Sequence, residues 1–195
     1  MNILVDALPT MIRVGDNTYN INWDFRTSIN ILEAFADRNL VAIEKQGILL
    51  KNLFVEEIRQ EDQEDAVKLA AKFIAGPSNK DGDGGDNKLY YSMSKDAPLI
   101  YAAFHQTHGI DLQESHMHWW KFLALFADLG SETVFCNLVG LRKRVASGEA
   151  SKEEQKAARN MGDMFKVEQI DDRTIEEIEA ERQFMSLAKA NKVKK

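Results

Sequence analysis

Cysteine is nearly absent from this chain, which has one in 195 residues. Cys136 therefore has no partner for an intrachain disulfide, and a reducing cytosol suits the protein. Its apolar neighbours in 133–138 predict an inert, buried thiol rather than a nucleophile. No stretch approaches the roughly 18 apolar residues of a membrane span. Residues 1–8 have neither a basic region nor an apolar core, so we expect no signal peptide and a soluble, intracellular protein.

Positive charge is outnumbered, with 25 Lys and Arg against 31 Asp and Glu, and the formal net charge is −6. Nucleic-acid-binding domains usually carry a basic patch, whereas basic residues cluster here only at 142–144 and 189–195. We therefore expect no nucleic-acid partner. The 44% of hydrophobic and 29% of charged residues are typical of a globular protein. The length suits one medium domain, or one domain with an appendage.

Catalytic motifs are missing as well. There is no Gly-x-Ser-x-Gly elbow, and no Cys/His pair with the spacing of a nucleophile and its base. Gly82, Gly84 and Gly85 are not followed by the Lys-Ser/Thr of a phosphate loop. The sequence therefore predicts that the protein is not an enzyme and has no cofactor or small-molecule substrate.

Two weak metal patterns remain. Four histidines lie within fourteen positions: His105, His108, His116 and His118. They match neither the spacing of a structural zinc site nor His-Glu-x-x-His, so we interpret them as structural or surface residues. The loop that starts at Asn79 follows the calcium-binding EF-hand pattern in part, but Tyr90 stands where that pattern requires a bidentate glutamate. We predict no metal.

Hydrophobic periodicity predicts a mainly α fold with one N-terminal β-hairpin. The hairpin covers 11–22 around the turn residues Gly15-Asp16-Asn17. Residues 40–54 fit either a helix or a short strand pair. Helical spacing and caps at Asp24, Ser131 and Ser151 predict helices over 24–36, 61–75, 96–108, 112–129, 131–147 and 151–165.

Two segments differ from the helical domain expected over 1–166. Residues 78–88 are polar, acidic and glycine-rich, so we expect a mobile loop. Residues 167–195 are expected to form a C-terminal extension whose helix, over 171–195, carries an apolar seam of Ile175, Ile178 and Met185. This helix has too little apolar surface to fold alone, so it docks either on the main domain or on a partner.

The run His116-Met117-His118-Trp119-Trp120-Lys121-Phe122 concentrates aromatic side chains on one predicted helix. Adjacent helical residues point about 100° apart, so the two tryptophans cannot share one narrow stripe. Either one anchors the core while the other meets a second surface, or both fill a wide core. Tryptophan is enriched at binding hot spots. The candidate partner-binding residues are therefore Trp119, Trp120, Lys121 and Phe122, together with the seam of the extension.

Several short patterns, spread over about 11–165, give the chain a family resemblance. They are the hairpin before Asp24-Phe25-Arg26, Tyr101–Phe104, Gly109–Leu112, His118–Phe122, Leu125–Leu129, Thr133-x-Phe135 and Arg142. In these features the chain resembles small tail-assembly proteins of long-tailed phages and prophages of Gram-positive bacteria, which are encoded just upstream of the tape-measure protein.

The resemblance implies a tail assembly chaperone in the cytoplasm of the bacterial host. Such a protein binds the tape-measure protein, and possibly the tail-tube protein, and keeps its apolar helices soluble. Self-association is left open. The resemblance supplies no catalytic residues. Two alternatives remain: a structural protein retained in the virion, and a metal-dependent enzyme built on the four histidines.

Overall fold

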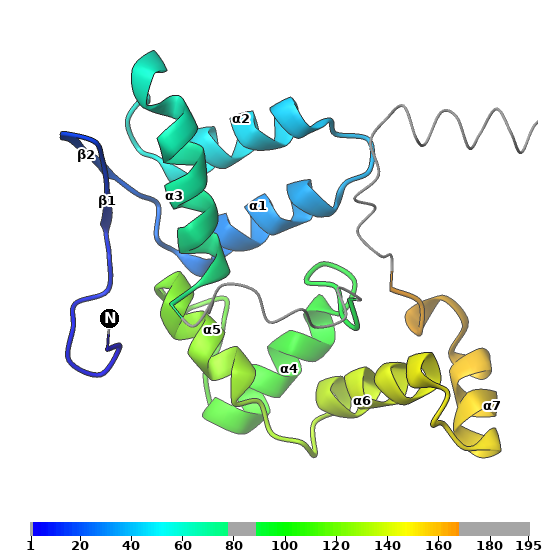
Figure 1. Cartoon of the computed structure of the whole chain (residues 1–195). Helices are drawn as coiled ribbons and strands as arrows, with labels where there is room; N and C mark the ends of the chain where they lie inside the picture. The colour runs from blue at the N-terminus through cyan, green and yellow to red at the C-terminus, as the bar shows by residue number, and fades with distance from the viewer. Residues whose placement is uncertain (1, 78–88, 168–195) are drawn as a thin grey trace, which may run out of the picture.

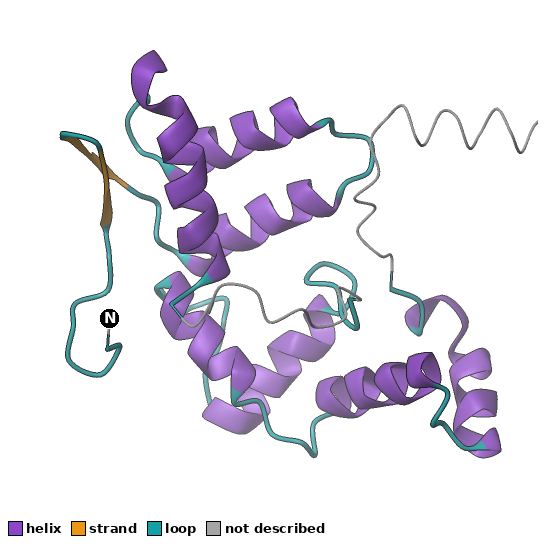
Figure 2. Cartoon of the chain, in the orientation of Figure 1, coloured by secondary structure: helices purple, strands orange, loops and turns teal. Residues whose placement is uncertain are grey.

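The computed structural model describes residues 2–77 and 89–167, and it confirms the mainly helical fold with an N-terminal hairpin (Figures 1 and 2). The elements are β1 (Met11–Val14), β2 (Asn17–Asn20), α1 (Phe25–Ala36), α2 (Ala42–Leu53), η1 (Gln60–Asp62), α3 (Gln63–Ala75), α4 (Ala97–His108), α5 (Trp119–Ala127), α6 (Val134–Ser147), α7 (Lys152–Met161) and η2 (Gly162–Met164). The predictions for the loop 78–88 and for the extension, with Ile175, Ile178 and Met185, lie outside the described residues.

The hairpin is antiparallel and pairs Val14 with Asn17. Its turn is therefore one residue shorter than predicted, because Asn17 belongs to β2. Gly15 has a φ of 57°, a conformation that favours glycine. The Tyr19 hydroxyl and the Asn17 amide both donate to the carboxylate of Asp62, at 2.6 and 2.8 Å. These bonds tie the hairpin to the start of α3, beside which it lies in Figure 1.

Helices α1 and α2 lie alongside each other, and α3 packs on α2 (Figure 1). Asp24 caps α1 as predicted, with its carboxylate accepting from the Arg26 amide at 3.0 Å. Residues 42–53 form a helix, so the alternative of a short strand pair is wrong. Leu49 and Leu53, four residues apart, are both buried, which fits one face of a helix packed on the domain.

The predicted helix over 112–129 begins only at Trp119. The guanidinium of Arg26 donates to the backbone carbonyls of Leu112, Gln113 and Ser115, at 2.6, 3.2 and 3.0 Å. These bonds hold the preceding segment in turns and extended backbone instead of a helix. The prediction failed here because it used only the local apolar spacing in 112–118. The side chain that determines this backbone, Arg26, lies more than eighty residues away in the sequence.

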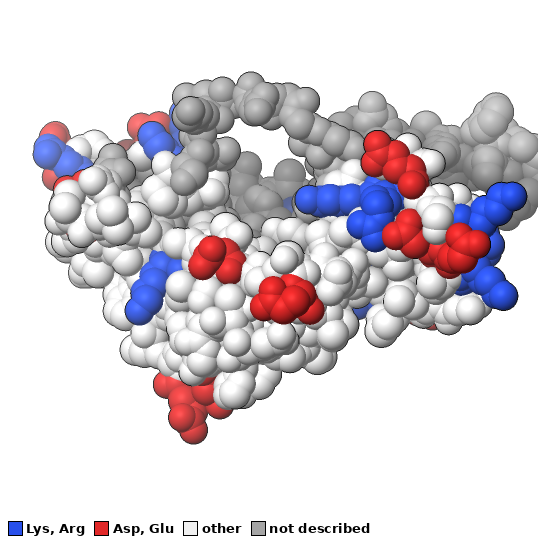
Figure 3. Space-filling view, turned by 90° about the horizontal axis from the view of Figure 1, so that it is seen from below, with Lys and Arg blue, Asp and Glu red and all other residues white. Residues whose placement is uncertain are grey.

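Helix α6 also begins later than predicted, and Thr133 replaces Ser131 as its cap. The Thr133 hydroxyl accepts from the Cys136 amide and donates to the Gly130 carbonyl. Helix α7 begins as predicted, because Ser151 and Glu154 form a reciprocal capping box. Seen from below, charged side chains gather at the end of the molecule that α6 and α7 form (Figure 3).

Phe122 lies at the centre of the core and is fully buried. The rings of Phe25 and Phe104 stack on it, each with its centroid 4.9 Å away. Trp119 and Phe126 stack on it from the same helix, at 5.6 and 5.8 Å. The core thus joins α1, α4 and α5 through aromatic rings. None of the helices in the described ranges has the length and apolarity that a membrane crossing requires.

Candidate functional site

The two adjacent tryptophans both bind the C-terminal end of α3. The indole N–H of Trp119 donates to the Ile74 carbonyl, and that of Trp120 donates to the Phe73 carbonyl, each at 2.8 Å. The last carbonyls of a helix lack partners in its next turn, so the bond from Trp119 satisfies the Ile74 carbonyl, whereas the Phe73 carbonyl also accepts from the Gly76 amide at 3.2 Å. The pair is therefore a structural clamp between α5 and α3.

His118 caps α5 directly before the tryptophans. Its Nδ1 accepts from the Trp120 amide at 3.0 Å, and its Nε2 lies 3.0 Å from the Pro9 carbonyl, to which it donates. These two roles require the neutral imidazole. The ring of Trp23 stacks on it with a centroid distance of 5.8 Å. Burial lowers the pKa of His118 below its usual value of 6.5, whereas the bond to Pro9 acts in the opposite direction.

This lowered pKa makes the stability of the fold depend on pH. Below about pH 6.5 the unfolded chain binds a proton at His118 that the folded chain resists, so stability falls as the pH drops. We expect His118→Asn, which keeps a capping oxygen but does not titrate, to flatten the loss of unfolding free energy between pH 7 and pH 5. Urea unfolding at both values measures it. His105→Asn, at an exposed histidine, is the control, and an equal effect of the two substitutions would refute the assignment.

The candidate partner residues divide between core and surface. Trp119 is 1% exposed and Phe122 is 0% exposed, so neither offers a partner any surface in this fold. Trp120 is partly buried and Lys121 is exposed. A contact with a partner stays a prediction for these two residues.

The histidines bond to different groups, although His116 and His118 both pack on the ring of Trp23. His116 lies 2.8 Å from the Asp24 carboxylate, and His108 lies 2.9 Å from the Leu125 carbonyl. His118 is engaged at the helix cap, and His105 is exposed on α4. Within residues 2–77 and 89–167, no three His, Cys, Asp or Glu side chains are grouped as a metal ion would require.

A buried ion pair is the main feature that sequence reasoning missed. The guanidinium of Arg142 on α6 binds both carboxylate oxygens of Asp96, at 2.6 and 3.0 Å, and the two side chains are 3% and 2% exposed. Its remaining N–H groups donate to the carbonyls of Tyr90, Met164 and Phe165. All five guanidinium hydrogens are thus bound. The pair joins the start of α4, helix α6 and the residues after α7.

An apolar groove lies between the second half of α2, the segment 54–58 and the start of α3. It encloses about 520 Å³, and its apolar lining comprises Gly47, Leu50, Phe54, Val55 and Ile58. Val55 is 61% exposed, and Ile43, one turn before Gly47, is 72% exposed. A Cβ atom built on Gly47 would meet nothing within 4 Å. Packing therefore does not require a glycine here, and its missing side chain leaves space in the groove. The glycine within the apolar segment 40–54 was the signal available in the sequence.

The described domain thus presents a packed aromatic core and an open apolar groove. A family model described as "Bacteriophage Gp15 protein" matches residues 4–167, and the chain belongs to this family. The match confirms the phage affiliation that the sequence resemblance implied. No curated protein and no solved structure matches the chain.

Proposed function

We propose that this phage protein is a tail assembly chaperone that binds the tape-measure protein non-covalently in the host cytoplasm and keeps it soluble. Membership in a phage family and a resemblance to tail-assembly proteins support the setting. The net charge of −6 supports the solubilising role, because charge far from zero keeps protein complexes in solution.

The observation that carries the proposal is the apolar groove on α2. Gly47 and Leu50 line it, and the exposed Ile43 lies one turn before Gly47 on the same face of α2. Exposed apolar side chains around a groove are typical of protein-binding surfaces rather than of ordinary surface residues. Helix-in-groove recognition uses this arrangement, in which a client helix lays its apolar face against the groove.

The occupant that we propose is an amphipathic helix of the tape-measure protein. The rim of the groove carries Glu56 and Glu57 against one positive charge, that of Lys51. We therefore expect client segments with lysine or arginine beside their apolar face. Because the client is long and must be released during tube assembly, many weak contacts of this kind suit the function better than one tight site.

Charge placed in the groove at Val55 and beside it at Ile43 should weaken client binding without unfolding the domain. We expect Ile43→Glu with Val55→Glu to weaken binding at least tenfold, since each apolar side chain contributes roughly 1.5–3 kcal/mol when it is fully buried. Both residues are exposed, so the thermal melt should be unchanged. The matched control is Val134→Glu, which changes an exposed apolar residue on α6, away from the groove. Equal binding by the double variant and the control would contradict the assignment of the groove.

Co-expression with the tape-measure protein of the same genome tests the function itself. A soluble complex with many copies of this chain per tape measure is the expected result. Failure to bind, or to raise tape-measure solubility, would overturn the proposal. The alternative of a structural tail protein predicts stoichiometric presence in purified virions, whereas a chaperone should be absent from them.

A further inference from the structure

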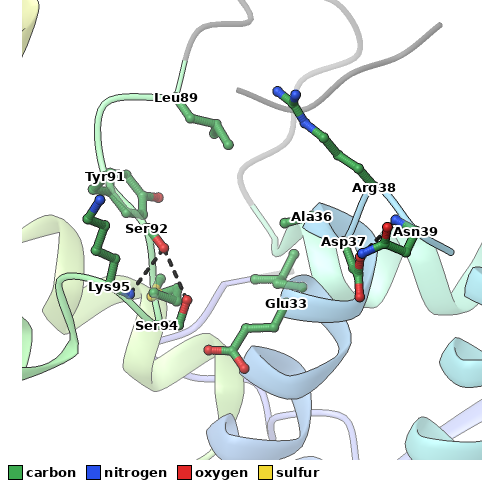
Figure 4. Close-up of a pocket in the computed structure, with 12 residues that line it drawn as sticks. Glu33, Ala36, Asp37, Arg38, Asn39, Leu89, Tyr91, Ser92, Ser94 and Lys95 are labelled. Carbon is green, nitrogen blue, oxygen red and sulfur yellow. Dashed lines mark hydrogen bonds between the residues drawn. The ribbon is translucent and has the colours of Figure 1, made fainter. Parts of the chain in front are cut away.

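A second and larger groove lies between the end of α1 and residues 89–95. It encloses about 750 Å³. Its apolar lining comprises Leu32, Ala36, Leu89, Tyr91 and Met93. Figure 4 shows Leu89 and Tyr91 on one side of it and the last turn of α1 on the other. This groove does not share any lining residue with the one on α2.

The described chain ends close to this groove. Arg142 binds the carbonyls of Met164 and Phe165 with the same guanidinium that binds the carbonyl of Tyr90, the neighbour of the lining residue Tyr91. The ammonium groups of Lys166 and, to a lesser extent, Lys95 lower the pKa of Asp163. Lys95 also lines the groove. The backbone at 163–166 is therefore held beside the rim.

The next 28 residues, 168–195, begin at this point. Ile175 lies eight positions after Val167, a length that spans about 12 Å as a helix and at most about 28 Å when extended. The groove adjoins the point where the described chain ends, at Val167. The apolar seam of Ile175, Ile178 and Met185 can therefore reach it. The acidic residues Asp171 and Asp172 precede them. The charged lining of the groove is balanced, with Arg38 and Lys95 against Glu33 and Asp37, so the fit of the segment rests on apolar contact.

We propose that the C-terminal segment 168–187 of this chain docks in the groove between α1 and residues 89–95. Its apolar seam covers Ala36, Leu89 and Tyr91. The segment has too little apolar surface to fold alone, and the groove supplies the missing apolar partner. The inference does not depend on the tape-measure protein.

Disulfide trapping in the full chain tests the proposal. In a Cys136→Ser background, Ala36→Cys is combined in turn with Ile175→Cys, Ile178→Cys or Met185→Cys. A disulfide forms only when the two Cα atoms come within about 7 Å. We expect at least one pair to close within the monomer under mild oxidation, with at least a fivefold higher yield than its control.

The matched control replaces Ala36→Cys by Ala157→Cys, an exposed alanine on α7, which contacts η2 near the end of the described chain but does not line the groove. A flexible segment without a docking site would cross-link to both nearby positions with similar yield, and that result would overturn the proposal. Cross-links between molecules only, which disappear on dilution, would overturn it as well and assign the segment to a second copy.

Discussion

Replacing Trp119 by alanine should lower the free energy of unfolding by about 3–5 kcal/mol, the cost of removing a large aromatic side chain from a packed core. The change deletes the stack on Phe122 and leaves the Ile74 carbonyl without its donor. A loss of this size corresponds to a decrease of roughly 6–20 °C in Tm for a domain of this length. Thermal melts and urea titrations of the purified variant measure it.

Two further variants separate ring packing from the hydrogen bond. Trp119→Phe keeps an aromatic ring but removes the indole N–H, so it should cost about 1–3 kcal/mol for the unpaired carbonyl, besides some lost packing. Trp120→Ala should cost less than Trp119→Ala, because Trp120 is only partly buried. An unchanged melt for Trp119→Ala would contradict the core placement and return this residue to the list of partner contacts.

Removing Arg142 should be about as damaging as removing Trp119. Arg142→Ala leaves the Asp96 carboxylate buried without its counter-charge, a change that typically costs about 3–5 kcal/mol. It also removes a hydrogen-bond donor from each of three backbone carbonyls. We expect a fall in Tm of several degrees or more, with the residues after α7 released from the domain.

The matched control for Arg142 lies two residues further along α6. Arg144 pairs with Glu154 at 2.7 Å, but both side chains are partly open to solvent. Water screens such pairs, so Arg144→Ala should cost much less. Replacing both members of the buried pair, Arg142→Met with Asp96→Leu, should recover part of the loss, because no isolated buried charge remains. Equal effects of Arg142→Ala and Arg144→Ala would refute the structural role of the buried pair.

The released segment links this prediction to the second groove. Arg142 positions the backbone at 164–165 beside Tyr90. In the cross-linking experiment, the Arg142→Met/Asp96→Leu background should therefore lower the yield with Ala36→Cys. A lower yield in a variant that is still folded would show that Arg142 positions the backbone at 164–165 in addition to stabilising the fold.

Local patterns in the sequence were enough for most elements. The cap at Asp24 and the capping box of Ser151 with Glu154 predicted the starts of α1 and α7, because a cap bonds to amides within three residues. The hairpin followed from turn residues between β-branched ones. The net charge and the lack of a basic patch, which bear on the choice of partner, were also visible without the fold.

Tertiary contacts decided what local patterns do not encode. Arg26 determined where α5 begins, through carbonyls more than eighty residues away. Both tryptophans are positioned by hydrogen bonds to the end of α3, and Arg142 is paired with the buried carboxylate of Asp96. The sequence alone determined most of the helical segments, because periodicity and capping act over a few residues, but it left 40–54 open and wrongly extended a helix over 112–118. Only the tertiary structure decided which aromatic side chains are core and where the grooves lie, because both depend on segments brought together from distant parts of the chain.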